Sequence, residues 1–186
     1  MSTPPLPTLT DTLAPISDAL DALSHEQRVN WMRGLPSRDM AALYALASQG
    51  GPLGLDHFTG KEGEVIIHWG QNSLPAFSVF QKRIVRQGDV VQGYNHQTMS
   101  WITGPGHFTL QQNAEGVYFD YTTHPPTSHP EFPPLRDNMA GFSRFVYGGT
   151  IDKCRRVSQH AIIGAAFRAN KPLGAYFMLV RETLPG

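Results

Sequence analysis

The chain contains a single cysteine, Cys154, among its 186 residues. One thiol excludes an internal disulfide framework and every zinc site that is built on several cysteines. Charged residues are also scarce, at 16% of the chain, where about 25% is typical of a soluble domain. Lysine and arginine (15) balance aspartate and glutamate (15), so the chain lacks the basic excess of nucleic-acid-binding proteins. We therefore expect no nucleic-acid partner.

Long apolar runs are absent as well. No stretch approaches the roughly 20 apolar residues that cross a bilayer as a helix. Residues 1–13 have neither the basic nor the apolar region of a secretory signal peptide, and no Asn-x-Ser/Thr sequon occurs. We therefore expect a soluble cytoplasmic protein without a membrane span. A chain of this length can bury about 70% of the surface of its unfolded form, so its core needs no metal or disulfide.

Helical periodicity is confined to the first fifty residues. Apolar side chains of residues 16–23 share one helical face. Ser24 and Gln27 then form a predicted capping box before a second helix, which Gly34 is expected to end. A third helix is predicted over residues 38–48. These three short helices are too short to be stable alone, so they need a partner surface.

From Leu53 onward the hydrophobic period changes from about 3.6 to 2, the period of a strand. Glycine (18) and proline (15) are abundant and separate eight or nine short strands at a spacing of roughly 8–12 residues. Examples are residues 64–69, 77–85, 90–96, 98–103, 144–147 and 155–160. Such a series is typical of an antiparallel barrel or sandwich.

Glycines inside the predicted strands, Gly93 and Gly164, favour the barrel, because closing a small barrel requires bends. We therefore predict a mainly β protein. An antiparallel barrel of 8–9 strands (residues 53–186) carries an N-terminal cap of about three short helices (residues 1–52), and the two parts form one cooperative domain. Residues 124–135 hold five prolines and cannot form a central strand or a helix. They are either a stiff surface connection or a lid over the barrel mouth.

The C-terminal part of the chain resembles the closing strands of lipocalin-like (calycin) barrels. In residues 147–168 an aspartate leads into Arg-x-Val and then into a strand that contains Gly164. Residues 174–181 form an aromatic-rich last strand that ends in Arg181. This order is similar to that of the uncharacterised bacterial GXWXG-type proteins, although Trp69 has no glycine two positions to either side. The resemblance implies a barrel fold with a cavity for an apolar small molecule, and it implies no catalytic residues.

Eight histidines suggest a metal site, but none has the spacing of a known ligand set. The nearest cluster, His124 and His129 with Glu131, is interrupted by prolines and lies on no regular element. No phosphate-binding loop and no Gly-x-Ser-x-Gly nucleophile elbow occurs. Cys154 has cationic neighbours but no fixed base, so we interpret it as incidental. We expect neither a metal nor a cofactor.

Hydrogen-bonding and aromatic side chains come together on the strands in the middle of the chain. Side chains two positions apart share one face of a strand. An inward orientation of one such set would line an aromatic pocket with a few polar groups, which is typical of small-molecule sites. This set comprises Trp69, Tyr94, His96, Trp101 and Tyr121. Several strands are apolar on both faces, so the pattern does not decide which face is interior. Any single aromatic side chain of the set is better explained as core filling, whereas for the set as a whole a ligand site explains the pattern equally well.

Two functions fit such a pocket. The first is binding of a hydrophobic small molecule in the barrel cavity, with Tyr94, His96 and Gln97 orienting its polar end. The second is a cofactor-independent isomerase or cyclase that acts on a bulky apolar substrate. In that case His96 or His68 would be the general acid/base, and Tyr94 or Lys82 would polarise a carbonyl. An interaction scaffold with a filled core is a third alternative. Neither the ligand nor the oligomeric state follows from the sequence.

Overall fold

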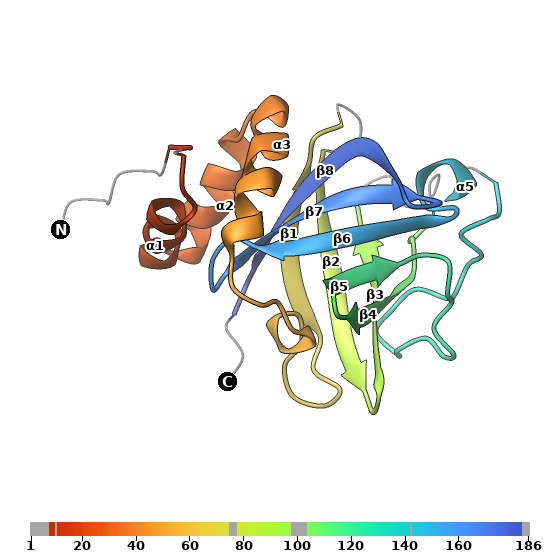
Figure 1. Cartoon of the computed structure of the whole chain (residues 1–186). Helices are drawn as coiled ribbons and strands as arrows, with labels where there is room; N and C mark the ends of the chain where they lie inside the picture. Colours follow the sequence, from red (N-terminus) through yellow and green to blue (C-terminus); the bar gives the residue numbers. More distant parts are fainter. Residues whose placement is uncertain (1–7, 10, 75–77, 98–103, 142, 184–186) are drawn as a thin grey trace.

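The computed structural model describes residues 8, 9, 11–74, 78–97, 104–141 and 143–183. Within these residues the chain forms a closed antiparallel barrel of eight strands, in which each strand pairs with the next and β8 pairs with β1 (Figure 1). The strands are β1 (Ile66–Asn72), β2 (Val79–Gln87), β3 (Val90–His96), β4 (Phe108–Asn113), β5 (Gly116–Asp120), β6 (Thr150–Arg156), β7 (Ala161–Arg168) and β8 (Lys171–Arg181). The predicted mainly β barrel is confirmed.

Two predicted strands differ from the structure. Residues 144–146 belong to a short helix, α5 (Ser143–Val146), and the bond from the amide of the next residue, Tyr147, to the Ser143 carbonyl closes its turn at 2.7 Å. Four residues are too few for the hydrophobic pattern to distinguish a helical turn from a strand. The strand expected at 155–160 is β6, which lies earlier in the chain, and residues 157–160 form the bend before β7. The strand expected at 98–103 lies outside the described residues.

The three predicted helices are α1 (Ala14–Ala22), α2 (His25–Gly34) and α3 (Ser37–Leu46). The capping box that begins α2 is confirmed. The Ser24 hydroxyl accepts from the Gln27 amide at 3.3 Å, and the Gln27 side chain accepts from the Ser24 amide at 2.9 Å. None of the helices in the described ranges combines the length and the apolarity that crossing a membrane requires.

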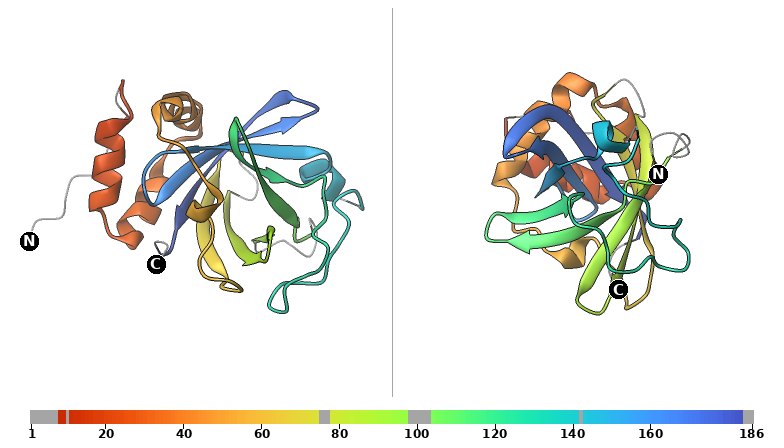
Figure 2. Two further views of the ribbon diagram at one scale, coloured as in Figure 1. Left: turned by 60° about the horizontal axis from the view of Figure 1, so that its bottom comes forward. Right: turned by 90° about the vertical axis from the view of Figure 1, so that its right-hand side faces the viewer.

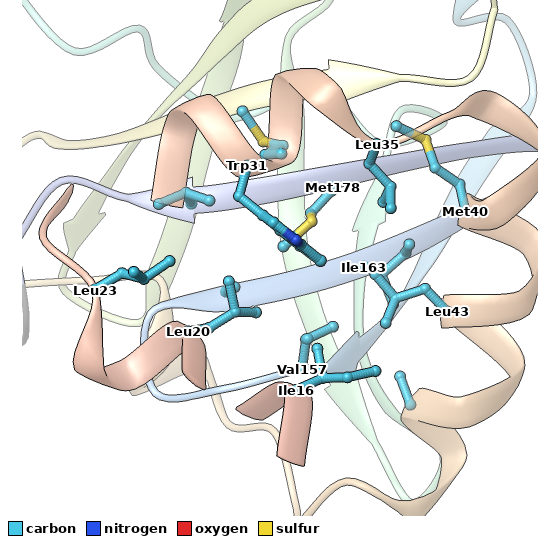
Figure 3. Packing of buried hydrophobic residues seen from close by; sticks show 14 of the residues in the cluster. Ile16, Leu20, Leu23, Trp31, Leu35, Met40, Leu43, Val157, Ile163 and Met178 are labelled. Atoms are coloured by element: carbon cyan, nitrogen blue, oxygen red, sulfur yellow. The ribbon is translucent and has the colours of Figure 1, made fainter. Parts of the chain in front are cut away.

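The helices lie against the outer face of β7, β8 and β1, at the end of the molecule away from α5 (Figures 1 and 2). Figure 3 shows side chains from all three helices meeting strand residues, for example Leu43 beside Ile163 and Trp31 beside Met178. All four of these side chains are buried. The helices therefore explain why β7 and β8 are apolar on both faces.

Three glycines that point into the barrel each face a phenylalanine on the neighbouring strand. A β-carbon at any of these glycines would lie within 3 Å of the opposite ring, so the ring occupies the space of the missing side chain. The pairs are Gly70 with Phe80, Gly93 with Phe108, and Gly164 with Phe177. Glycine in these strands therefore does more than permit a bend, because it lets aromatic rings fold down over the sheet.

One end of the barrel is closed by the segment that precedes β1. The 3-10 helix η2 (Leu55–His57) leads Phe58 into this end, where the Phe58 side chain is fully buried. Its ring centroid lies 5.4 Å from that of Phe119 and 5.7 Å from that of His68. The Phe58 ring therefore fills this end of the barrel.

The proline-rich segment 124–135 lies along the outer face of the barrel. The Phe132 ring packs on Tyr94 of β3 with 4.9 Å between centroids, and a ring nitrogen of His107 lies 3.2 Å from the Pro134 carbonyl oxygen. Of the two interpretations left open by the sequence, these contacts support the surface connection.

Candidate ligand-binding site

A cavity of about 410 Å³ occupies the end of the barrel that lies away from Phe58. Its rim is apolar and exposed, and its inner end is polar and buried. The rim includes Leu74, Phe145, Val146 and Leu173, and the inner end is formed by Lys82, Asn95, Tyr121 and Asp152. The helix α5 supplies part of the rim, and Figure 2 (right) looks at this end of the molecule.

Lys82 is the centre of the inner end. It lies on β2 between Phe80 and Ile84 in the inward-facing series, and only 2% of its surface is exposed. The Lys82 ammonium donates to Asn95 Oδ1 at 2.9 Å and to the Tyr121 hydroxyl oxygen. Its Nζ lies 3.8 Å from Asp152 Oδ2, which makes the pair a buried salt bridge between β2 and β6. A buried ammonium needs such partners because desolvation costs it several kcal/mol.

The neighbours of Lys82 are themselves held in place. Asn95 donates through Nδ2 to the Gly106 carbonyl at 3.2 Å and to the Tyr121 hydroxyl at 3.2 Å. Asn138 donates to the Tyr121 carbonyl at 2.9 Å, and the Tyr121 ring stacks on Tyr147 with 5.2 Å between centroids. The inner end is therefore a preorganised polar network rather than a loose group of side chains.

Aromatic rings surround the Lys82 ammonium. Nζ lies 4.4 Å from the Phe119 ring centroid, and the Tyr121 ring contributes at 5.1 Å. The remaining rings are those of the three glycine-paired phenylalanines, Phe108 at 4.7 Å, Phe177 at 5.1 Å and Phe80 at 5.6 Å. Cation–π attraction to desolvated cations is worth about 2 kcal/mol or more at a good site. The glycines in the strands thus build the aromatic surroundings of the cation.

Burial brings the pKa values of Lys82 and Asp152 closer together. It lowers the pKa of Lys82 to about 8, although the charge of Asp152 opposes this shift. Burial also raises the pKa of Asp152 to about 6, although the charge of Lys82 opposes this shift. Burial raises the pKa of Tyr121 well above its ordinary value, so Tyr121 stays protonated. Burial therefore makes transfer of a proton from Lys82 to Asp152 less costly than it is between the same groups in water.

Three of the candidate residues from the sequence point into the barrel, and a fourth, Gln97, also lines the cavity. Lys82 and Tyr121 meet at the inner end of the cavity. His68 is the direct partner of Lys82 on β1 and is fully buried, but it lies beside Phe58 and does not line the cavity. Burial, with the charge of Arg181, lowers the pKa of His68 to about 3, so its imidazole is neutral at physiological pH.

The other candidates that the structure describes point away from the barrel interior and do not line the pocket that the sequence suggested. Trp69 lies on the outer face of β1 beneath α2, with the Arg33 guanidinium 5.7 Å from its ring. Tyr94 lies on the outer face of β3 under Phe132, and His96 on the same face is exposed. Trp101 lies outside the described residues. Outer-face aromatics are buried here by the helices and the proline-rich segment, which a strand pattern cannot distinguish from burial in the interior.

Asp152 and Asn95 are site residues that the candidate set from the sequence did not contain. Asn95 is two positions from Gly93, so the inward position of the glycine also places the amide inside. Asp152 is the one acidic residue of β6 and alternates with Thr150 and Cys154, which are both buried. In the sequence, the charge of Asp152 on an otherwise uncharged face of its strand is the feature that could have indicated a site residue. Burial raises the pKa of the Cys154 thiol, which keeps it protonated.

Across the described ranges, no group of three His, Cys, Asp or Glu side chains is placed to hold a metal ion. Comparison with protein-family models, with curated proteins and with solved structures gives no match for this chain. The function is therefore argued from the geometry of the cavity.

Proposed function

We propose that the chain binds a mainly apolar small molecule in the barrel cavity, with one neutral hydrogen-bond acceptor of the ligand directed at Lys82. The observation that carries this proposal is an apolar cavity of about 410 Å³ that ends on a buried lysine, whose ammonium gives two hydrogen bonds to the protein and has a third N–H to donate. An apolar pocket with a few convergent polar groups is typical of small-molecule sites. The closed eight-stranded barrel is also compatible with the lipocalin-like resemblance of the C-terminal strands.

The charges of the site favour a carbonyl over other head groups. A cationic head group would be repelled by Lys82, and an anionic one would compete with Asp152 for the same ammonium. A carbonyl oxygen accepts from Lys82 and leaves the buried ion pair intact. The exposed apolar rim residues then surround the rest of the molecule.

The size of the cavity supports ligand binding over a scaffold with a filled core. Protein interiors are packed as densely as organic crystals, and voids larger than a water molecule are few. A cavity of about 410 Å³ falls within the range of small-molecule pockets, about 300–1,000 Å³.

A second candidate function is the cofactor-independent isomerase or cyclase. The specific observation in its favour is the meeting of Lys82, Tyr121 and Asp152, whose acidities suit proton exchange near neutral pH. Lys82 would polarise a carbonyl, Asp152 would move the proton, and Tyr121, hydrogen-bonded to both, would hold them in place. His96 faces solvent and His68 packs on Phe58 and does not line the cavity, so neither histidine is part of this proposal.

The binding proposal is tested with prodan, a fluorescent apolar ketone whose emission shifts to the blue in an apolar site. We expect one saturable site per chain. Ala166→Trp fills the cavity from β7 and is expected to lower the affinity by at least about tenfold. The matched variant Ala41→Trp, on the exposed face of α3, and His96→Ala on the outer face of β3 should bind as the wild type does. Binding that does not saturate, or that is unchanged in Ala166→Trp, would contradict the proposal.

The enzymatic alternative is tested on whatever molecule copurifies with the protein. Native mass spectrometry identifies its mass, and incubation with fresh protein shows whether it is converted into an isomer. Recovery of the unchanged molecule favours binding. Conversion that is lost in Lys82→Met and Asp152→Asn, but retained in His96→Ala, supports the isomerase or cyclase.

A further inference from the structure

We propose that Lys82 forms an imine with the carbonyl carbon of an apolar aldehyde held in the barrel cavity. This inference rests on the proposed function, because it assigns a substrate class and a covalent bond to the same site. Lys82 lies at the inner end of the cavity and is 2% exposed, and five aromatic rings surround its Nζ.

Burying a lysine ammonium costs more desolvation free energy than burying a neutral hydrogen-bond donor. Binding of a carbonyl needs only a donor, and a neutral amide such as that of Asn95 supplies one with a smaller desolvation cost. Replacing a buried ion pair by apolar residues is often neutral or stabilising, so the Lys82–Asp152 pair is not explained by stability. What lysine adds to an amide is a nucleophile. Desolvation in an apolar pocket is one of the ways in which a lysine amine is activated.

The site holds the groups that the reaction needs. The Lys82 ammonium gives a proton to the Asp152 carboxylate, 3.8 Å away, and becomes a neutral amine. The nitrogen lone pair forms the C–N bond, the carbonyl π electrons move to oxygen, and a proton passes from nitrogen to that oxygen. The resulting carbinolamine hydroxyl takes the proton from Asp152 and leaves as water. The products are a protonated imine, an Asp152 carboxylate and one water molecule, and no oxidation or reduction occurs.

The surroundings also suit the product. The protonated imine keeps the positive charge where Lys82 carried it, beside Asp152 and among the rings. Asn95 and Tyr121 hold the nitrogen by hydrogen bonds, and Lys82 itself lines the cavity, whose rim offers apolar contacts to the rest of the aldehyde. Because the nitrogen is crowded, a carbonyl carbon with one substituent fits better than a carbon with two. The geometry therefore selects an aldehyde over a ketone.

The test uses trans-cinnamaldehyde with sodium cyanoborohydride, which reduces imines to stable amines. The sequence has four lysines, and the other three, Lys61, Lys153 and Lys171, lie at the surface. At pH 7 an amine with a pKa near 8 carries roughly three hundredfold more neutral form than an ordinary lysine. We expect one saturable adduct that peptide mapping assigns to Lys82, formed at least about tenfold faster than any surface adduct. Lys82→Arg should abolish it, and Lys61→Arg should retain it.

Prodan displacement by cinnamyl alcohol, which cannot form an imine, separates the two proposals. Displacement without an adduct on Lys82 would overturn the imine and leave the proposed function standing. Neither displacement nor adduct would overturn both, and adducts confined to surface lysines would overturn the imine. If Lys82→Arg does not fold, mapping of the wild-type adduct still decides the question because it needs no variant.

Discussion

Gly164 and Phe177 face each other across β7 and β8, and a β-carbon at Gly164 would lie 2.1 Å from the Phe177 ring. The ring can fold over the sheet only because position 164 has no side chain. Folded over in this way, it reaches the ammonium of Lys82 from β8, 5.1 Å away. The glycine at position 164 of β7 thus determines which ring lies beside the Lys82 ammonium on β2.

This contact predicts a coupled pair. Gly164→Ala should destabilise the protein by about 1–3 kcal/mol, the usual cost of overpacking a core. Phe177→Leu frees the space above position 164, so adding Gly164→Ala to it should cost much less. Urea denaturation of both single variants and the double variant measures the coupling free energy. Gly51→Ala, at an exposed glycine with no atom near its β-carbon, is the control. Equal costs of Gly164→Ala in both backgrounds would show that the ring contact is not what excludes a side chain.

The buried ion pair predicts a characteristic pH dependence. The folded-state pKa of Asp152 is raised from 3.8 to about 6, so its stabilising contribution is present below pH 3.8 and is lost as the pH rises through 6. The pKa of Lys82 is lowered from 10.5 to about 8, so its contribution to stability grows as the pH rises from 8 toward 10.5. Each shift corresponds to about 3 kcal/mol.

The comparison is with Lys82→Met/Asp152→Asn, which removes both titrations and keeps similar shapes. The unfolding free energy of the wild type minus that of the variant should be lowest between pH 6 and 8 and should rise on both sides. Denaturation at pH 4, 7 and 10 measures it, and titrations common to both proteins cancel. A difference that is flat across this range would mean that the pair is not buried as described.

His68 predicts a loss of stability in acid. Its folded-state pKa is lowered from 6.5 to about 3, so its contribution is complete above pH 6.5 and is lost as the pH falls toward 3. Between pH 7 and 5 this loss amounts to about 2 kcal/mol. His68→Leu, which places an apolar side chain against Phe58, should reduce the acid-induced loss by that amount. His124→Gln, at an exposed histidine, should leave the loss unchanged, and an equal effect of both variants would rule out His68 as the cause.

The contacts of the helices with the barrel predict that the chain unfolds in one step. Leu43 of α3 is fully buried in the cluster that contains Ile163 and Met178 of the barrel. Leu43→Ala should cost about 2–5 kcal/mol and should shift the helical circular dichroism and the prodan signal together. Leu135→Ala, at an exposed leucine outside the cavity, should cost less than about 0.5 kcal/mol. Separate transitions for the two signals would divide the chain into a cap and an independent barrel.

Features that depend on neighbouring residues could be predicted from the sequence. The capping box of Ser24 and Gln27 needs only local spacing, and the strands of the barrel follow from alternation and turn residues. The turn of α5 was missed because four residues carry no distinctive period. The inner face of β7 could not be identified, since residues 161–165 are all buried, by the barrel on one face and by the helices on the other.

The site could be predicted only in part, because its residues come from distant strands. Lys82 on β2, Asn95 on β3 and Asp152 on β6 meet only after the barrel closes. The sequence indicates Lys82 and Tyr121 because charge and aromaticity are visible in it. It does not separate Trp69 and Tyr94 from them, because a covered outer face has the same composition as an interior. Only the packing of α2 and of the proline-rich segment distinguishes the two.

The filling of one end of the barrel by the Phe58 ring also has a kinetic consequence for the proposed ligand binding. Under the proposed binding function, molecules would exchange through the rim near α5, because Phe58 fills the other end, and a second molecule could not reach Lys82 while the cavity is occupied. Replacement therefore waits for the first molecule to leave. The exchange rate is set by the residence time of the occupant and does not increase with the concentration of a competitor.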